Sequence, residues 1–179
     1  MNINPRLIVV MGVSGSGKST LAKALSAHLK FLFMEADDFH LPSSIDKMAS
    51  GIPLDEGDRA PWINAMCHFL TKEPHDTVLA YSGLKKNHRV RFRQLGYKIH
   101  FIYLRGNVQS LQTRLQNRDN HFMAQSLLES QLQAMEAPDN ESDITPMDID
   151  DFTDLDASIT FIKQTLFYQQ QSEQHKVYE

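Results

Sequence analysis

The chain has 179 residues, of which 41% are apolar, so it is long enough for one domain with a sizeable core. Its net charge of −4 disfavours nucleic acid and anionic membranes as partners, because the protein offers no general positive field to either. No apolar run approaches the ~18 residues of a membrane span, and the single cysteine, Cys67, excludes an internal disulfide, which is consistent with a cytoplasmic location.

Apolar strand-like runs alternate with helical patterns along the chain. In chain order we expect a strand at 7–11, a helix at 18–30, a strand at 31–34, a helix at 59–71, a strand at 77–81, a helix at 85–95, a strand at 99–104, helices at 108–117 and 124–135, a strand at 147–149 and a helix at 154–167. Pro146 confines the fifth strand to a sheet edge or a strand start. The polar tail, 169–179, has little to bury and is expected to fray. The alternation predicts an α/β fold with helices on both faces of a parallel sheet.

A phosphate-binding motif follows the first predicted strand. Residues 12–19 read Gly-Val-Ser-Gly-Ser-Gly-Lys-Ser, a full match to G-x-x-x-x-G-K-[ST]. The glycines allow a tight turn whose backbone amides face phosphate, Lys18 reaches the β/γ oxygens, and the Ser19 hydroxyl can bind Mg²⁺. The helix that follows adds a positive end. The predicted nucleotide-binding residues are Gly12, Ser14, Gly15, Ser16, Gly17, Lys18, Ser19 and Thr20.

Two carboxylates follow the second predicted strand, where ligands of open parallel sheets bind. Glu35 and Asp37 are spaced by two, so an extended backbone would point both side chains into one cleft. One carboxylate could bind a magnesium-bound water while the other accepts the proton of an acceptor hydroxyl. The alternative is that these acidic residues only cap a helix or form a turn.

Several further segments resemble the gluconate kinase family, within the shikimate-kinase-like and adenylate-kinase-like phosphotransferases. The segments that carry the resemblance are residues 12–19, 35–40, 47–54, 58–62, 82–86 with Arg89, 101–104, Arg114 with Arg118, and 121–122. The similarity spans about residues 7–150. The chain departs from the family pattern at Ala36, Ser44, Gly57, Gly83 and Asn120, and two of these, Ser44 and Gly57, lie in the stretch that would choose the sugar acid.

The resemblance implies a P-loop NTPase fold with a five-stranded parallel sheet. It implies a single kinase domain at 1–168, with an acceptor-binding insertion at about 40–72 and a lid at about 117–133. The implied reaction is ATP- and Mg²⁺-dependent phosphorylation of D-gluconate to 6-phospho-D-gluconate by a homodimer. Two alternatives stay open: a kinase for another sugar acid or small metabolite, and a non-catalytic nucleotide-dependent switch or binding module.

The resemblance also implies residue roles. Asp37 would be the base on the sugar-acid hydroxyl, with Lys18 beside it, and Glu35 would join Ser19 at the metal. Arg59 is suited to a substrate carboxylate because its planar fork can bond both oxygens, although it could instead be an exposed arginine paired with Asp58. The remaining substrate-binding candidates are His40, Ser82 and Lys85, whereas Lys86 and Arg89 are equally well interpreted as solvated helix residues.

Arg114 and Arg118 are spaced four apart, on one face of a predicted helix. In related kinases such a pair precedes the lid, with the first arginine near the adenine and the second near the transferred phosphate. Arg118 would therefore meet the charge that develops in the reaction, unless both are ordinary surface charges. The acidic residues 139–143 do not fit a calcium loop and are interpreted as a solvated loop.

Overall fold

The computed structural model describes residues 4–116, 121–151 and 154–176, and the side chains of these residues except those of 121–126 and 167–176. Five strands form one sheet in the order β2-β3-β1-β4-β5, and every neighbouring pair is parallel. The strands are β1 (Arg6–Met11), β2 (Leu32–Glu35), β3 (Thr77–Ala80), β4 (Lys98–Arg105) and β5 (Ile144–Asp148). The predicted α/β fold with a parallel sheet is confirmed.

Alternate residues of the strands face two separate apolar cores. Ile8 and Val10 of β1 pack with residues of α1 (Lys18–Leu29), α5 (Val108–Gln116) and α7 (Leu155–Lys176). Leu7 and Val9 point the other way and pack with α3 (Glu56–Lys72) and α4 (Lys86–Arg93). Because successive side chains of a strand point to opposite faces, β1 is apolar from Leu7 to Met11, as a strand in the middle of the sheet must be.

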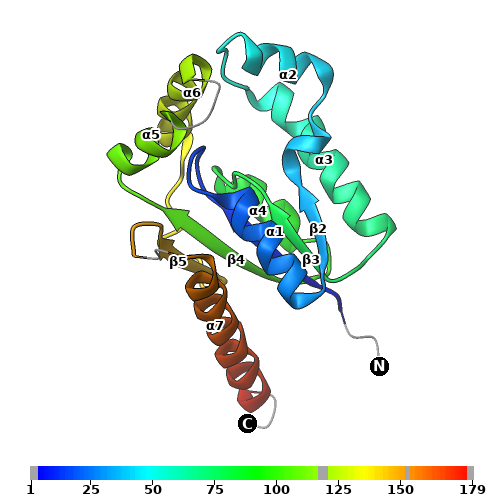
Figure 1. Cartoon of the computed structure of the whole chain (residues 1–179). Coiled ribbons are helices and arrows are strands. Elements are labelled where there is room, and N and C mark those ends of the chain that lie inside the picture. Colours follow the sequence, from blue (N-terminus) through cyan, green and yellow to red (C-terminus); the bar gives the residue numbers. More distant parts are fainter. Residues whose placement is uncertain (1–3, 117–120, 152–153, 177–179) are drawn as a thin grey trace.

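The remaining helices lie beyond the carboxyl ends of the strands. These are the short 3-10 helix η1 (Ala36–Phe39), α2 (Pro42–Ala49) and α6 (His121–Ala134). Figure 1 shows α5 and α6 on one side of this edge and α2 and α3 on the other, and α2 contacts α6. The sheet thus presents the ends of β1, β2 and β3 to a space flanked by helices from distant parts of the chain (Figure 1).

The structure differs from the prediction in several places. Residues 36–49 form η1 and α2, which were not predicted; Pro42 begins α2, and its eight residues carry only a short apolar stripe, whose Ile45 is half exposed. The third helix begins at Glu56, where Asp55 and Asp58 form a capping box. The tail does not fray at 169, because α7 continues to Lys176 through residues that contain neither Gly nor Pro.

The fifth strand begins at Ile144, earlier than predicted, and includes Pro146. It occupies the sheet edge, as the proline requires. Cys67 is buried in α3, where burial raises the pKa of its thiol, in agreement with an inert packing role. Across the described part of the chain, no helix is both long enough and apolar enough to cross a membrane.

Candidate active site

The phosphate-binding motif forms a tight loop between β1 and α1. Gly12 has a φ of +148°, and a Cβ there would lie 2.5 Å from the carbonyl oxygen of Leu104. Gly17 adopts a left-handed conformation immediately before α1. Lys18 Nζ donates to the carbonyl of Val13 at 3.0 Å, so the lysine lies across its own loop. The hydroxyl of Ser16 is buried without a hydrogen-bond partner among the described residues.

One side of this loop borders a cavity of about 270 Å³, here named the α7 cavity. Its lining residues are Ser16, Gly17, Thr20, Leu21, Leu104, Arg114, Met147, Ile149, Asp154, Leu155 and Ser158. Arg114 is fixed there by a 3.0 Å hydrogen bond from Nη2 to the carbonyl of Ile149. This cavity combines loop residues with apolar side chains of β4, β5 and α7, which suits a flat, uncharged group attached to a phosphate.

The other side of the loop borders a second cavity of about 140 Å³, here named the α3 cavity. It is lined by Ser14, Lys18, Glu35, Asp37, His40, Met48, Pro53, Leu54, Arg59, Trp62, Ala80, Tyr81, Ser82, Leu84, Leu127, Ser130 and Gln131. The structure therefore brings Lys18, both carboxylates, His40, Arg59 and Ser82 to one hollow. The phosphate loop separates the two cavities and contributes to both.

The two carboxylates reach the α3 cavity by a route that differs from the predicted one. Only Glu35 lies on the strand, and Asp37 lies on η1, so an extended backbone is not what brings them together. Burial raises the pKa of Glu35, against a hydrogen bond with Ser19 that lowers it. The pKa of Asp37 is lowered, chiefly by its contact with His40 and also by the charge of Lys18. Asp37 is 78% exposed and ionised, as a proton acceptor must be.

His40 lies between Asp37 and Trp62. Its ring stacks on Trp62 with centroids 4.0 Å apart, and its Nε2 lies 3.6 Å from Asp37 Oδ1. The other ring nitrogen, Nδ1, is buried without a partner. Trp62 Nε1 donates to the carbonyl of Ala36 at 2.6 Å and so holds the start of η1 against α3. Ala36 has no positive φ, so alanine in place of the family's usual glycine causes no backbone strain.

Arg59 and Lys85 meet at the carboxylate of Glu56. Arg59 borders both the α3 cavity and an adjoining cavity of about 490 Å³, and its side chain is only 14% exposed. It lies 3.7 Å from Glu56, whereas Asp58 pairs with Lys47 at 2.6 Å, so the alternative Arg59–Asp58 pair does not form. Lys85 lies outside the α3 cavity, in the adjoining one, and pairs with Glu56 at 2.8 Å.

Glu56 is therefore a residue that sequence reasoning missed. It also accepts from His88 Nε2 at 2.9 Å, and hydrogen bonds from Lys85 and His88 lower its pKa to about 2. A substrate carboxylate that binds Lys85 must compete with the carboxylate of Glu56. The spacing of Glu56 and Arg59, three apart at the start of a helix, was a usable signal for their contact.

Helix α6 supplies the remaining wall of the α3 cavity through Leu127, Ser130 and Gln131. The side chain of Gln131 accepts a 2.7 Å hydrogen bond from the backbone amide of Ser14, in the phosphate loop. The two residues lie 117 positions apart, and no local pattern in the sequence relates them. Gln131 thus connects the segment predicted as a lid directly to the loop.

Some predicted residues contribute indirectly or lie outside the description. The backbone amide of Gly12 donates to the carbonyl of Ser82 at 3.2 Å, which ties the phosphate loop to the loop after β3. Arg118 and Asn120 lie outside the described residues, so the predicted role of Arg118 stays a prediction. No group of three or more His, Cys, Asp or Glu residues in the described ranges is arranged to bind a metal ion by itself.

Comparisons with known proteins identify the family. A family model described as an AAA domain matches residues 7–138. A gluconokinase of Gluconobacter oxydans is 41% identical over 148 residues, which are 80% of this chain and 83% of that protein. The thermosensitive gluconokinase of Escherichia coli is 39% identical over 145 residues, covering 79% and 78% of the two chains. The chain belongs to the gluconokinase family.

Solved structures agree with this assignment. The crystal structure of a gluconokinase from Sinorhizobium meliloti matches with a TM-score of 0.79 and 34% identity, over 94% of this chain and 99% of that one. A shikimate kinase from Bacteroides thetaiotaomicron matches with a TM-score of 0.65 at 17% identity, over 89% and 97% of the two chains, and so shares the fold. The gluconokinase family and the P-loop kinase fold are thus confirmed as predicted.

Proposed function

We propose that this chain phosphorylates D-gluconate with ATP and releases 6-phospho-D-gluconate and ADP. The observation that carries the proposal is the α3 cavity, which is lined by Lys18 of the phosphate loop, the ionised carboxylate of Asp37 and the largely buried Arg59. A phosphoryl acceptor that carries both a hydroxyl and a carboxylate matches these groups. The α7 cavity, on the other side of the loop, would receive the adenosine of ATP beside Arg114.

Four residues of the α3 cavity have distinct roles in this reaction. Asp37 accepts the proton of the attacking hydroxyl, and His40 orients that carboxylate from its stacked position on Trp62. Arg59 binds the acid's carboxylate, and Ser82 contributes a hydrogen bond from the loop after β3.

Lys18 and the loop amides would bind the phosphates of ATP. The hydroxyl of Ser16, which is buried without a partner among the described residues, fits a bound phosphate chain. Ser19 and Glu35 are hydrogen-bonded to each other and together provide the oxygen ligands that Mg²⁺ prefers. When bound, Mg²⁺ neutralises charge on the transferring phosphoryl group.

The test is steady-state turnover of the purified chain with ATP and Mg²⁺, with ADP release coupled to a spectrophotometric signal. The acceptor panel contains D-gluconate, its epimer D-galactonate, a five-carbon aldonic acid, and D-glucose, which lacks the carboxylate. The proposal expects the highest kcat/KM with gluconate and little turnover of glucose. If another acid exceeds gluconate, the substrate is reassigned within the same reaction class. If ATP binds but no acid stimulates ADP release, a nucleotide-binding module replaces the kinase.

Further proposals accompany this function. Residues 40–72 would form the acceptor-binding insertion and residues 117–133 the lid of a single domain at 1–168, with Arg118 near the transferred phosphoryl group. We also propose a homodimer in the cytoplasm, which light scattering and cell fractionation would test. The single cysteine in the sequence is consistent with a reducing compartment.

A further inference from the structure

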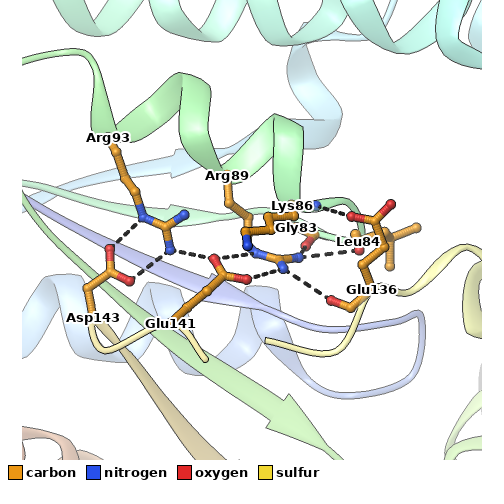
Figure 2. Close-up of polar contacts among 8 residues, drawn as sticks. All are labelled: Gly83, Leu84, Lys86, Arg89, Arg93, Glu136, Glu141 and Asp143. Carbon is orange, nitrogen blue, oxygen red and sulfur yellow. Dashed lines mark hydrogen bonds and ion pairs between the residues drawn. The ribbon is translucent and has the colours of Figure 1, made fainter. Parts of the chain in front are cut away.

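Arg89 is a fully buried arginine of α4 that the proposed reaction does not use. Its side chain has no exposed surface. Figure 2 shows the guanidinium surrounded by acceptors: Nη1 donates to the carbonyls of Gly83 at 2.7 Å and Leu84 at 3.3 Å, and Nη2 donates to the carbonyl of Glu136 at 3.1 Å. The prediction of a solvated helix residue is therefore wrong for Arg89, whereas Lys86 is exposed as that interpretation requires.

The three carbonyls belong to two chain segments whose neighbouring residues line the α3 cavity. Gly83 and Leu84 lie in the loop after β3, where Ser82 and Leu84 line the cavity and Lys85 borders the adjoining one. Glu136 lies just past the end of α6, which supplies Ser130 and Gln131 from the other side. One guanidinium thus joins the loop after β3 to the segment that follows α6, and both segments continue into residues that line the α3 cavity (Figure 2).

Two direct bonds reinforce this junction. The backbone amide of Glu136 donates to the carbonyl of Leu84 at 2.8 Å, and the amide of Lys86 donates to the Glu136 carboxylate at 2.7 Å. Gly83 packs so closely on β1 that a Cβ there would lie 2.7 Å from the sulfur of Met11. The loop after β3 therefore has little room to shift toward the sheet, and its distance from α6 depends on the junction itself.

The charge of Arg89 is compensated by Glu141, whose side chain is only 7% exposed. Glu141 also pairs with Arg93 at 2.6 Å, and Arg93 in turn pairs with Asp143 at 2.7 Å (Figure 2). Burial tends to raise the pKa of Glu141, but the hydrogen bonds from both arginines lower it overall. Because the ion pair is complete, the guanidinium tolerates burial and its planar fork fixes the direction of every bond. The expected solvated acidic loop at 139–143 is thus wrong for Glu141.

We propose that Arg89 is a positioning residue that sets the separation of the two walls of the α3 cavity, and thereby the affinity and size selectivity for the acceptor. The inference rests on the proposed function, because the α3 cavity is taken to bind the acceptor. None of the described contacts of Arg89 is with the α7 cavity or the phosphate loop, so its replacement should change acceptor affinity more than nucleotide affinity. Lysine cannot replace it, because an ammonium group lacks the fork that reaches both walls.

The test compares two conservative variants of the full chain, Arg89→Lys and Arg93→Lys. Both weaken a pairing with Glu141, but described contacts of Arg93 include neither Gly83, Leu84 nor Glu136, so Arg93→Lys is the matched control. For Arg89→Lys we expect the KM for gluconate to rise about tenfold and the Kd for ADP to stay within about twofold. The preference for gluconate over a five-carbon aldonic acid should also fall. For Arg93→Lys, KM and preference should stay within about twofold of wild type.

An Arg89→Lys protein that unfolds at a lower temperature while its KM and acceptor preference are unchanged would overturn the inference, as would an equal KM rise in Arg93→Lys. Should Arg89→Lys not fold, Glu136→Ala removes the bond to the Lys86 amide at the same junction and leaves Arg89 intact. A KM increase of about threefold is then expected, and an unchanged KM contradicts the inference. Failure of the proposed function would be recognised separately, because the wild-type protein would then turn over no sugar acid. That result would also overturn the inference about Arg89.

Discussion

The phosphate loop and the α3 cavity are built in opposite ways. The loop is a contiguous run of residues whose backbone amides and glycine conformations would bind phosphate, with Lys18 as its charged side chain. The α3 cavity is assembled from side chains of η1, α3, the loop after β3 and α6 around the phosphate loop, and its Ser14–Gln131 contact joins residues 117 positions apart. A site that binds through the backbone can therefore be recognised from a short motif. A site built from side chains depends on the packing of the whole domain.

The two regions also differ in how their charges are balanced. Arg59 and Lys85 already contact Glu56, whose pKa of about 2 shows how strongly it is attracted to the cations around it. The phosphate loop instead contains a buried hydroxyl without a partner at Ser16. The loop is thus ready for an anion, whereas an acceptor carboxylate must rearrange existing ion pairs. Changes on the loop side should affect nucleotide binding, and changes in the α3 cavity should affect acceptor binding or the chemical step.

Asp37→Asn is the variant expected to separate these regions most sharply. Loss of the proton acceptor should lower kcat by about 10²–10⁴-fold, while the Kd for ADP remains close to that of wild type. The neighbouring exposed residue provides the control, Asp38→Asn, which should keep nearly full activity. Steady-state kinetics and calorimetric titration with ADP measure the two quantities. Full kcat in Asp37→Asn would remove this residue from the mechanism.

Lys18→Met tests the loop side. Because the lysine borders the α3 cavity and would bind the phosphates, kcat should fall by roughly 10²–10³-fold and ATP should bind more weakly. Affinity for gluconate, measured by titration without nucleotide, should change little. The opposite result, weak gluconate binding with normal ATP binding, would contradict the division of the site into these two regions.

His100 tests whether pH acts on the scaffold rather than on either region. Burial lowers the pKa of this β4 histidine to about 4, and its Nε2 lies 2.9 Å from Thr145 Oγ1. The unfolded chain, with an ordinary histidine pKa, binds the proton first, so stability falls as the pH drops from about 6.5 toward 4. Between pH 7 and pH 5 the loss from this group is about 2 kcal/mol.

Urea unfolding of wild type and His100→Gln at both pH values measures this contribution. The variant should lose about 2 kcal/mol less than wild type on acidification. Equal losses would show that this histidine is not the group responsible, and the pH dependence would then have to come from other titrating groups.

Arg59→Lys is expected to have the smallest effect of the four. The KM for gluconate should rise about tenfold with kcat nearly unchanged, because a lysine keeps the charge but not the bidentate geometry. Lys85→Met should raise KM less, since Lys85 lies outside the α3 cavity and is paired with Glu56. A larger effect at Lys85 than at Arg59 would reverse the assignment of the carboxylate-binding residue.

The sequence is a good guide to the scaffold because long apolar runs fix its strands. β1 is buried from Leu7 to Met11 and β4 is buried in its middle, from His100 to Ile102, which leaves few other places for these segments to fold. The short helix α2 is harder to recognise, because its eight residues carry only a short apolar stripe. The polar tail was misjudged for a related reason: its helix depends on local propensity and not on an apolar face.

The sequence reveals the residues of the candidate site only where they form a local motif. The phosphate loop and the pair Glu35 and Asp37 were found from spacing, although η1 rather than an extended strand brings the second carboxylate to the cavity. Arg89 could not be placed in this way, because the carboxylate that compensates its charge, Glu141, lies 52 residues away. Gln131 likewise meets the phosphate loop only through the tertiary fold.

Phosphorus NMR of the wild-type protein with ATP, Mg²⁺ and D-gluconate tests the central claim most directly, since it follows the transferred group itself. The account predicts that ADP and one new phosphomonoester, at the C6 hydroxyl of gluconate, appear in equal amounts and only when gluconate is present. Release of inorganic phosphate alone, or ADP formation that does not depend on gluconate, would contradict the claim that the α3 cavity delivers an acceptor to the phosphate loop.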